Sequence, residues 1–229
     1  HPYNAPLYLN PALAGSTGAG RFASLFRDQW PGFAQDYKTL YLSYDHMLNS
    51  YHSGLGMYFM RDDAGTLKNN ILAFAYSYKL EFLEKKLRIN PGLDFSMLTT
   101  LLDTTGLTLS GEELYTRKNN FDMSFGLQAT TKRLNFGMVA KHLLEPNTSM
   151  SKGGTSRLRM KYTGMLDYTV GEIDENKAFK FNFGLFYEQQ GPSERFTGTL
   201  VAAWRKLRLG AGYSNNESII LKAAWEGVI

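Results

Sequence analysis

The segment Ile71–Phe82 reads Ile-Leu-Ala-Phe-Ala-Tyr-Ser-Tyr-Lys-Leu-Glu-Phe. Every second residue in it is large and apolar or aromatic, and these residues are Leu72, Phe74, Tyr76, Tyr78, Leu80 and Phe82. The residues between them are small or charged: Ala73, Ala75, Ser77, Lys79 and Glu81. Because successive side chains of a β-strand point to opposite faces, this alternation predicts a strand with one apolar face and one small or polar face.

The same alternation recurs along most of the chain and predicts an all-β protein of about twelve strands. The predicted strands cover residues 21–28, 37–47, 54–59, 71–82, 87–97, 121–128, 134–138, 157–170, 178–188, 195–205, 207–213 and 218–226. Residues 1–19 hold three of the seven prolines, each of which would remove a donor from a strand ladder. We therefore predict an irregular N-terminal arm at 1–19 and a β-domain at 20–229.

Composition excludes several classes of function. The chain has 229 residues, a net charge of +4 and no cysteine. Without cysteine, disulfide bonds, zinc–thiolate sites and thiol catalysis are excluded. No block of Lys and Arg residues is present, so we expect no nucleic-acid partner. No apolar run reaches the roughly 18 residues of a transmembrane helix.

The strands could form either a closed barrel or a soluble sandwich of two sheets. A sandwich would turn the apolar faces inward. A closed barrel of this size is too wide for side chains to fill, so its apolar face would meet lipid and its polar face would line the lumen. Strands of about ten residues match a tilted membrane crossing, and connections that alternate between long and short are typical of outer-membrane proteins. We therefore predict an antiparallel up-and-down transmembrane β-barrel, with the arm on the periplasmic side.

Motifs for catalysis and metal binding are weak. His46 and His52 flank one predicted turn, where a solvated turn is a simpler interpretation than a metal pair. The segment Asp62-Asp63-Ala64-Gly65 resembles the start of a calcium loop but lacks the ligand spacing that should follow. We predict no catalytic residue, no metal and no cofactor, and hence no enzyme.

On the predicted parity, the lumen face carries more basic than acidic residues. Its densest group is Arg157, Arg159 and Lys161, which would lie on one face of one strand. Together with Lys180 and Arg88, these residues are predicted to bind an acidic or polar segment of a partner. The alternative is a solvated wall with local ion pairs.

Several short motifs resemble one protein family in their order and spacing. They are Pro6-Leu7-Tyr8-Leu9-Asn10-Pro11-Ala12-Leu13-Ala14-Gly15, Arg27-Asp28-Gln29-Trp30, Leu42-Ser43-Tyr44-Asp45, Ser53-Gly54-Leu55-Gly56, Asp62-Asp63-Ala64-Gly65, Tyr76-Ser77-Tyr78, Phe121-Asp122-x-x-Phe125-Gly126 and His142-Leu143-Leu144-Glu145-Pro146. The chain resembles the PorP/SprF family of the type IX secretion and gliding machinery of Bacteroidota over nearly its whole length.

The resemblance implies a location and partners. It implies a barrel of the bacterial outer membrane with about fourteen strands, so that a last hairpin would follow Ile229. Partners would be membrane lipid, other type IX components, and the C-terminal domain of a secreted cargo protein or adhesin, which the protein would retain at the cell surface. The alternative function is a passive outer-membrane channel or small-solute transporter.

The arm is the predicted periplasmic docking element, because it is rich in proline and tyrosine and too long for a simple barrel start. The residues assigned to docking are Tyr3, Tyr8, Asn10 and Pro11. The neutral alternative is that the arm only plugs the mouth of the barrel.

Overall fold

The computed structural model describes residues 5–29, 37–103, 114–171, 179–205, 207–216 and 218–225. Its helical segments there are short: α1 (Pro6–Leu9), η2 (Pro11–Leu13) and η3 (Asn49–Tyr51). No helix within these ranges has the length and apolar character needed to cross a membrane. The strands are β1 (Arg21–Gln29), β2 (Tyr37–Leu48), β3 (Ser53–Ala64), β4 (Leu67–Tyr78), β5 (Leu80–Phe82), β6 (Leu87–Leu102), β7 (Arg117–Thr130), β8 (Leu134–Lys141), β9 (Lys161–Gly171), β10 (Lys180–Gln190), β11 (Ser193–Trp204), β12 (Leu207–Ser214) and β13 (Ser218–Trp225).

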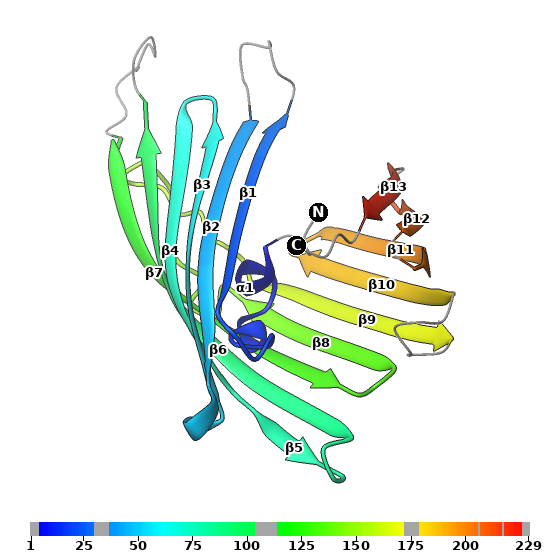
Figure 1. Cartoon of the computed structure of the whole chain (residues 1–229). Coiled ribbons are helices and arrows are strands. Elements are labelled where there is room, and N and C mark those ends of the chain that lie inside the picture. The colour runs from blue at the N-terminus through cyan, green and yellow to red at the C-terminus, as the bar shows by residue number, and fades with distance from the viewer. Residues whose placement is uncertain are drawn as a thin grey trace. The chain divides into compact units, whose positions relative to one another are not determined.

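The strands neighbour one another in the sheet in the order of the chain (Figure 1). Only β5 lies off this path, because it pairs with the start of β6. Pairs such as β2 with β3 and β10 with β11 are antiparallel. The antiparallel up-and-down, all-β topology predicted from the alternation is therefore confirmed.

The chain divides into two compact units, each of which is described by itself. The first comprises His1–Lys79, Asn90–Leu127 and Ala140–Met160, and so contains the arm, β1 to β4 and most of β6 and β7. The second comprises Leu80–Ile89, Gln128–Val139 and Lys161–Ile229, and so contains β5, most of β8 and β9 to β13.

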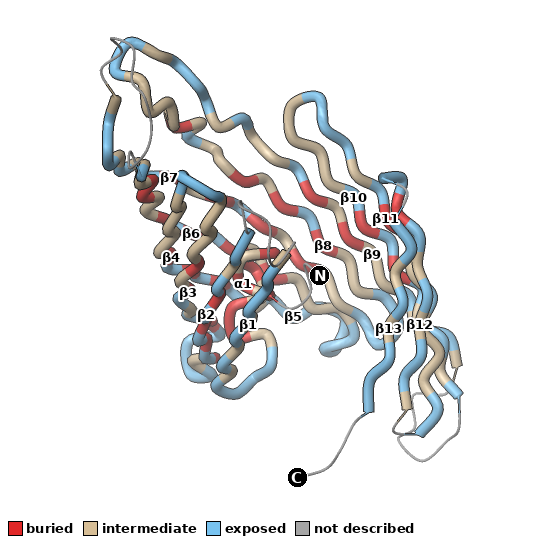
Figure 2. The backbone as a smooth tube through the Cα atoms, turned by 90° about the horizontal axis from the view of Figure 1, so that it is seen from above, coloured by how far each residue is buried: buried red, intermediate tan, exposed pale blue. Residues whose placement is uncertain are grey.

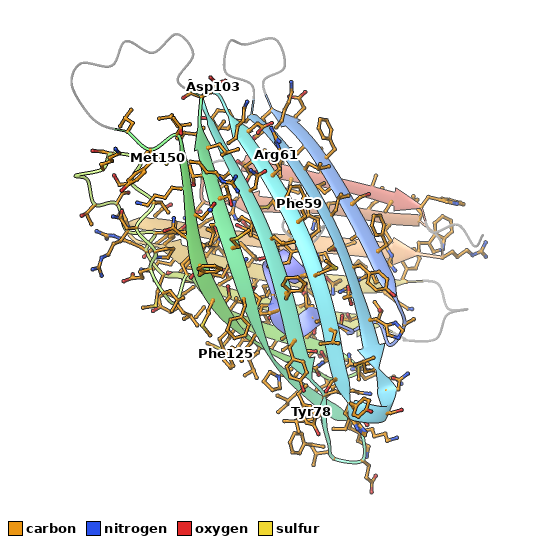
Figure 3. All side chains as sticks on the ribbon, turned by 90° about the vertical axis from the view of Figure 1, so that its left-hand side faces the viewer. Phe59, Arg61, Tyr78, Asp103, Phe125 and Met150 are labelled. Carbon is orange, nitrogen blue, oxygen red and sulfur yellow. The ribbon has the colours of Figure 1, made fainter. Side chains whose placement is uncertain are left out.

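In the first unit, the small side chains are buried and the large apolar ones are exposed. Along β4, Ala75 and Ser77 are 3% and 1% exposed, whereas Phe74 and Tyr76 are 58% and 46% exposed. Figure 2 shows this alternation along the strands. Figure 3 looks onto the apolar face, from which Tyr78 projects. A sandwich in water would show the opposite arrangement, so the direction predicted for Ile71–Phe82 is confirmed in β4.

The second unit follows the same rule. In β10, Phe183 and Leu185 are 48% and 43% exposed, while Gly184 between them is buried. An exception in size is Phe186, which lies on the small-residue face and is 5% exposed. Both units thus present an aromatic and aliphatic surface suited to lipid.

The segment Ile71–Phe82 is not one strand, which corrects the prediction. β3 begins at Ser53, which pairs with Tyr78 at the end of β4, and the next N–H, that of Lys79, donates to the His52 carbonyl at 2.7 Å. Leu80 then pairs with Ile89 as part of β5. The alternation continues across the break because the side-chain pattern reflects the two faces of a strand and does not indicate which strand it pairs with.

Two further predictions were wrong, one about the start of a strand and one about the lengths of the connections. β9 begins at Lys161, because the residues before it bond to a loop: the Leu158 N–H donates to the Pro146 carbonyl at 3.0 Å. The connections also do not alternate strictly between long and short. β3 and β4 are joined by Gly65 and Thr66 alone, and such tight turns occur wherever the local sequence supports them.

Candidate functional site

The described part of the N-terminal arm, residues 5–19, contains two short helical turns, each of which starts with a proline. Pro6 opens α1 and Pro11 opens η2, positions where the fixed φ of proline and its missing N–H are tolerated. Between them, the Asn10 Oδ1 accepts a hydrogen bond from the Ala12 N–H at 2.9 Å, as an N-cap. As predicted, the described part of the arm contains no strand, and its prolines open two short helical turns.

The arm lies on the small-residue face of the first unit. A Cβ placed on Gly54 would overlap the Ala14 carbonyl, and one on Gly92 would overlap the backbone of Ala12. Glycine at these positions lets the arm backbone touch the sheet directly. We call the small residues of this face the floor, and they are Gly54, Gly56, Ala73, Ala75, Gly92 and Gly126.

Side chains of the sheet bind the backbone of the arm. The Ser77 hydroxyl donates to the Ala14 carbonyl at 2.7 Å, and the Arg21 guanidinium donates to the Leu13 carbonyl at 3.0 Å. The Ser77–Ala14 bond is fully buried, so it is shielded from competition by water.

Asp45 fixes the point where the arm turns toward β1. Its side chain is 0% exposed, and both oxygens are bonded: Oδ1 accepts from the Gly15 N–H at 2.8 Å and Oδ2 from Arg21 Nε at 2.8 Å. Gly15 has a φ of +64°, which glycine adopts without strain. The buried carboxylate is thus paired and hydrogen-bonded, as burial of a charge requires.

Lys141, at the end of β8, holds the other end of the arm. Its ammonium donates to the Tyr8 carbonyl and lies 3.4 Å from the centroid of the Tyr8 ring. The Tyr8 ring also packs edge-on against Tyr58, with centroids 6.0 Å apart. A buried cation over an aromatic face is a favourable arrangement.

A second buried carboxylate lies in the same cross-strand row as Asp45. The register places Asp45 opposite Gly56, Gly56 opposite Ala75, and Ala75 opposite Asp94. Asp94 is 0% exposed, and within the described residues neither of its oxygens accepts a hydrogen bond. Lys141 acts on it electrostatically, so the charge is balanced without being directly solvated.

Asp122 and His142 form a buried pair beside Lys141. The His142 Nδ1 lies 2.6 Å from Asp122 Oδ2, and the Met123 N–H donates to Asp122 Oδ1 at 2.8 Å. His142 has a φ of +59°, so the chain turns sharply directly after Lys141. The pair therefore positions the residue that binds Tyr8.

The five predicted binding residues are divided between the two units. Arg157 and Arg159 belong to the first unit, are exposed and precede β9. Lys161, Lys180 and Arg88 belong to the second unit. Lys161 pairs with Glu188 at 2.9 Å, and Glu188 also binds Arg195 at 3.0 Å.

This local pairing agrees with the solvated-wall alternative for Lys161. The expectation that Arg157, Arg159 and Lys161 share one strand is wrong, while their binding role stays a prediction.

The predicted docking residues lie within the arm. Tyr3 falls outside the described residues. Asn10 is 0% exposed, with its Nδ2 donating to the Leu127 carbonyl at 3.3 Å, and Pro11 is also buried. Tyr8 is half-buried. Their periplasmic docking role stays a prediction, although these side chains contact the sheet.

Sequence reasoning did not single out the residues that hold the arm, namely Arg21, Asp45, Ser77 and Lys141. Their signal was present as polar or small residues on the face opposite the aromatics. The sequence pattern could not show that the arm is their partner, because contacts such as Lys141 to Tyr8 join residues far apart in the chain. Within the described residues, no group of His, Cys, Asp or Glu is arranged to hold a metal ion.

Comparison with known proteins gives one family. No curated protein matches the chain. A solved structure titled KdgM porin is similar over 92% of this chain and 100% of its own, with 14% sequence identity and a TM-score of 0.44. The family whose sequence model matches is described as type IX secretion system membrane protein PorP/SprF, and the match covers residues 3–225. The chain therefore belongs to the PorP/SprF family, outer-membrane β-proteins of the type IX secretion system.

Proposed function

We propose that this protein binds the C-terminal domain of a secreted cargo protein or adhesin and retains it at the cell surface. We further propose that it docks to periplasmic components of the type IX machinery. Membership of the family supports a role in secretion. The observation that carries cargo binding concerns the sheet face that contains the floor. This face binds a polypeptide backbone through Ser77 and Arg21.

One feature supports the binding of an acidic or polar cargo segment, and another supports docking to periplasmic components. Arg157 and Arg159 are exposed beside an ordered loop, in which the Thr148 N–H donates to the Ser156 carbonyl at 2.8 Å. The arm supplies the docking element, and among its described residues, 17–19 are exposed.

The competing function is a passive channel. Its support is the row of polar residues on the small-residue face, and the arm that lies on this face in the first unit counts against it. Conductance across a planar bilayer separates the two. A plugged binding protein passes little current, whereas a large steady current from the wild type would favour the channel.

The direct test is affinity purification from detergent-solubilised outer membrane, followed by mass spectrometry. We expect secreted proteins with a shared C-terminal domain in the wild-type eluate. The charge-reversed variant Arg157→Glu/Arg159→Glu/Lys161→Glu should lose them while it still assembles in the membrane. Lys85→Glu/Lys86→Glu/Lys132→Glu, a reversal of three exposed turn lysines, is the control. Equal recovery by both variants would remove the basic residues from the proposal.

A further inference from the structure

The arm does not satisfy every polar group on the sheet face that carries the floor. Leu93 and Phe95 are 37% and 56% exposed on the apolar face, so Asp94 between them points to the arm side, where it is 0% exposed. Among the described residues, neither Asp94 oxygen accepts a hydrogen bond, and the Lys141 ammonium, which acts on Asp94 electrostatically, donates to the Tyr8 carbonyl. A buried carboxylate without hydrogen bonds is unfavourable, so this face offers an acceptor that the arm does not use.

The contacts that hold the arm recognise its backbone. Ser77 and Arg21 donate to main-chain carbonyls, and Asp45 accepts from the main-chain N–H of Gly15. Any segment that follows the same path offers the same groups. The glycines set the other requirement, because a Cβ at Gly54 or Gly92 would overlap the arm backbone. The segment must therefore approach closely and carry small residues there.

The arm is joined to β1 by a linker that permits its release. Residues 17–20 are exposed, and Gly18 has a φ of +78° with no atom within 4 Å of its Cβ position. β1 pairs with β2 from Arg21 onward. The arm can thus leave the floor without unpairing a strand.

We propose that the floor is itself the binding site for a segment of the secreted partner, and that the arm is its resident competitor. The segment carries small residues over the glycines and a lysine or arginine that pairs with Asp94. This inference rests on the proposed function and names the place and chemistry of the contact.

The test locks the arm in place. The chain has no cysteine, and the Leu7 Cδ1 lies 2.7 Å from the position of a Cβ on Gly56, so we expect Leu7→Cys/Gly56→Cys to form a single engineered disulfide, which thiol titration checks. Secreted protein that co-purifies from solubilised outer membrane is measured before and after reduction of the same sample. We expect the oxidised form to recover at least about tenfold less than the reduced form.

Two single variants separate competition from damage. Tyr8→Ala removes contacts of the arm with Lys141 and Tyr58 and leaves every side chain of the sheet unchanged, so it should recover about fivefold more secreted protein, the factor for one cation–π contact. Asp94→Asn should recover less, and because it removes the charge that balances the buried Lys141, it should also melt at a lower temperature.

The outcomes distinguish failure of the floor as the binding site from failure of the proposed cargo-binding function. Equal recovery by the oxidised and reduced forms, with normal recovery by wild type, overturns the floor as the site and leaves cargo binding intact. Loss of recovery in Tyr8→Ala also overturns it, because release of a competitor must raise binding. If the wild type recovers no secreted protein, the proposed function fails and this inference fails with it.

Discussion

The Asp122 carboxylate and the His142 imidazole lie 2.6 Å apart, with side chains 2% and 14% exposed. This pair stands directly beside Lys141, whose ammonium binds the Tyr8 carbonyl. A strand-to-loop contact in the sheet thereby positions the cation that holds the N-terminal arm.

Removal of Asp122 should destabilise the first unit. In Asp122→Ala, the His142 ring and the Met123 N–H lose their acceptor in a buried site, so we expect the free energy of unfolding to fall by about 3 kcal/mol. Thermal unfolding in detergent, followed by circular dichroism, measures it. Asp103→Ala is the control, because its contact with Lys68 is 3.9 Å long and exposed, and a change of similar size there would contradict the assignment.

A side chain on the floor should displace the arm. Gly92→Val places a Cβ into the backbone of Ala12, so the arm must lift from the sheet. In a Leu7→Cys background, we expect maleimide labelling of residue 7 to be at least about tenfold faster, since labelling follows the open population. Gly164→Ala, where the added Cβ meets no atom within 4 Å, should label at the unmodified rate.

The two faces should differ in their tolerance of charge. Phe183→Lys in β10 puts an ammonium on the lipid face and should cost about 2–4 kcal/mol if it lies near the midplane. Asn182→Lys, one residue earlier on the half-exposed polar face, should cost much less. Membrane integration measured as heat-modified migration on gels compares them, and equal losses would reverse the faces.

The alternation alone would predict that Ala75 also accepts lysine. Ala75 is 3% exposed in the core that contains Leu7 of the arm, so we expect Ala75→Lys to be as damaging as a lipid-face lysine.

Glu188 should stabilise the second unit through ion pairs with two cations. It pairs with Lys161 at 2.9 Å and with Arg195 at 3.0 Å. In Glu188→Gln, both cations lose their partner, and because the site is partly exposed the loss should be about 1 kcal/mol and smaller at high salt. Denaturant unfolding at two salt concentrations measures this. Glu84→Gln, in an exposed turn, should leave the midpoint unchanged, and a salt-independent loss at Glu188 would argue against the ion pairs.

The sequence by itself determined the strands and their faces. Large residues such as Phe74 and Tyr76 alternate with Ala75 and Ser77, and the two-residue period of a strand converts that order directly into two surfaces. The period also assigned the apolar surface to lipid, because about twelve such strands enclose more space than side chains can fill.

Only the tertiary structure decided where the arm lies and what the small-residue face does. The row Asp45, Gly56, Ala75 and Asp94 exists only once four strands are in register. Lys141 meets Tyr8 only once β8 and the arm are brought together. Such contacts depend on the packing of segments distant in the chain, and a local side-chain period carries no information about them.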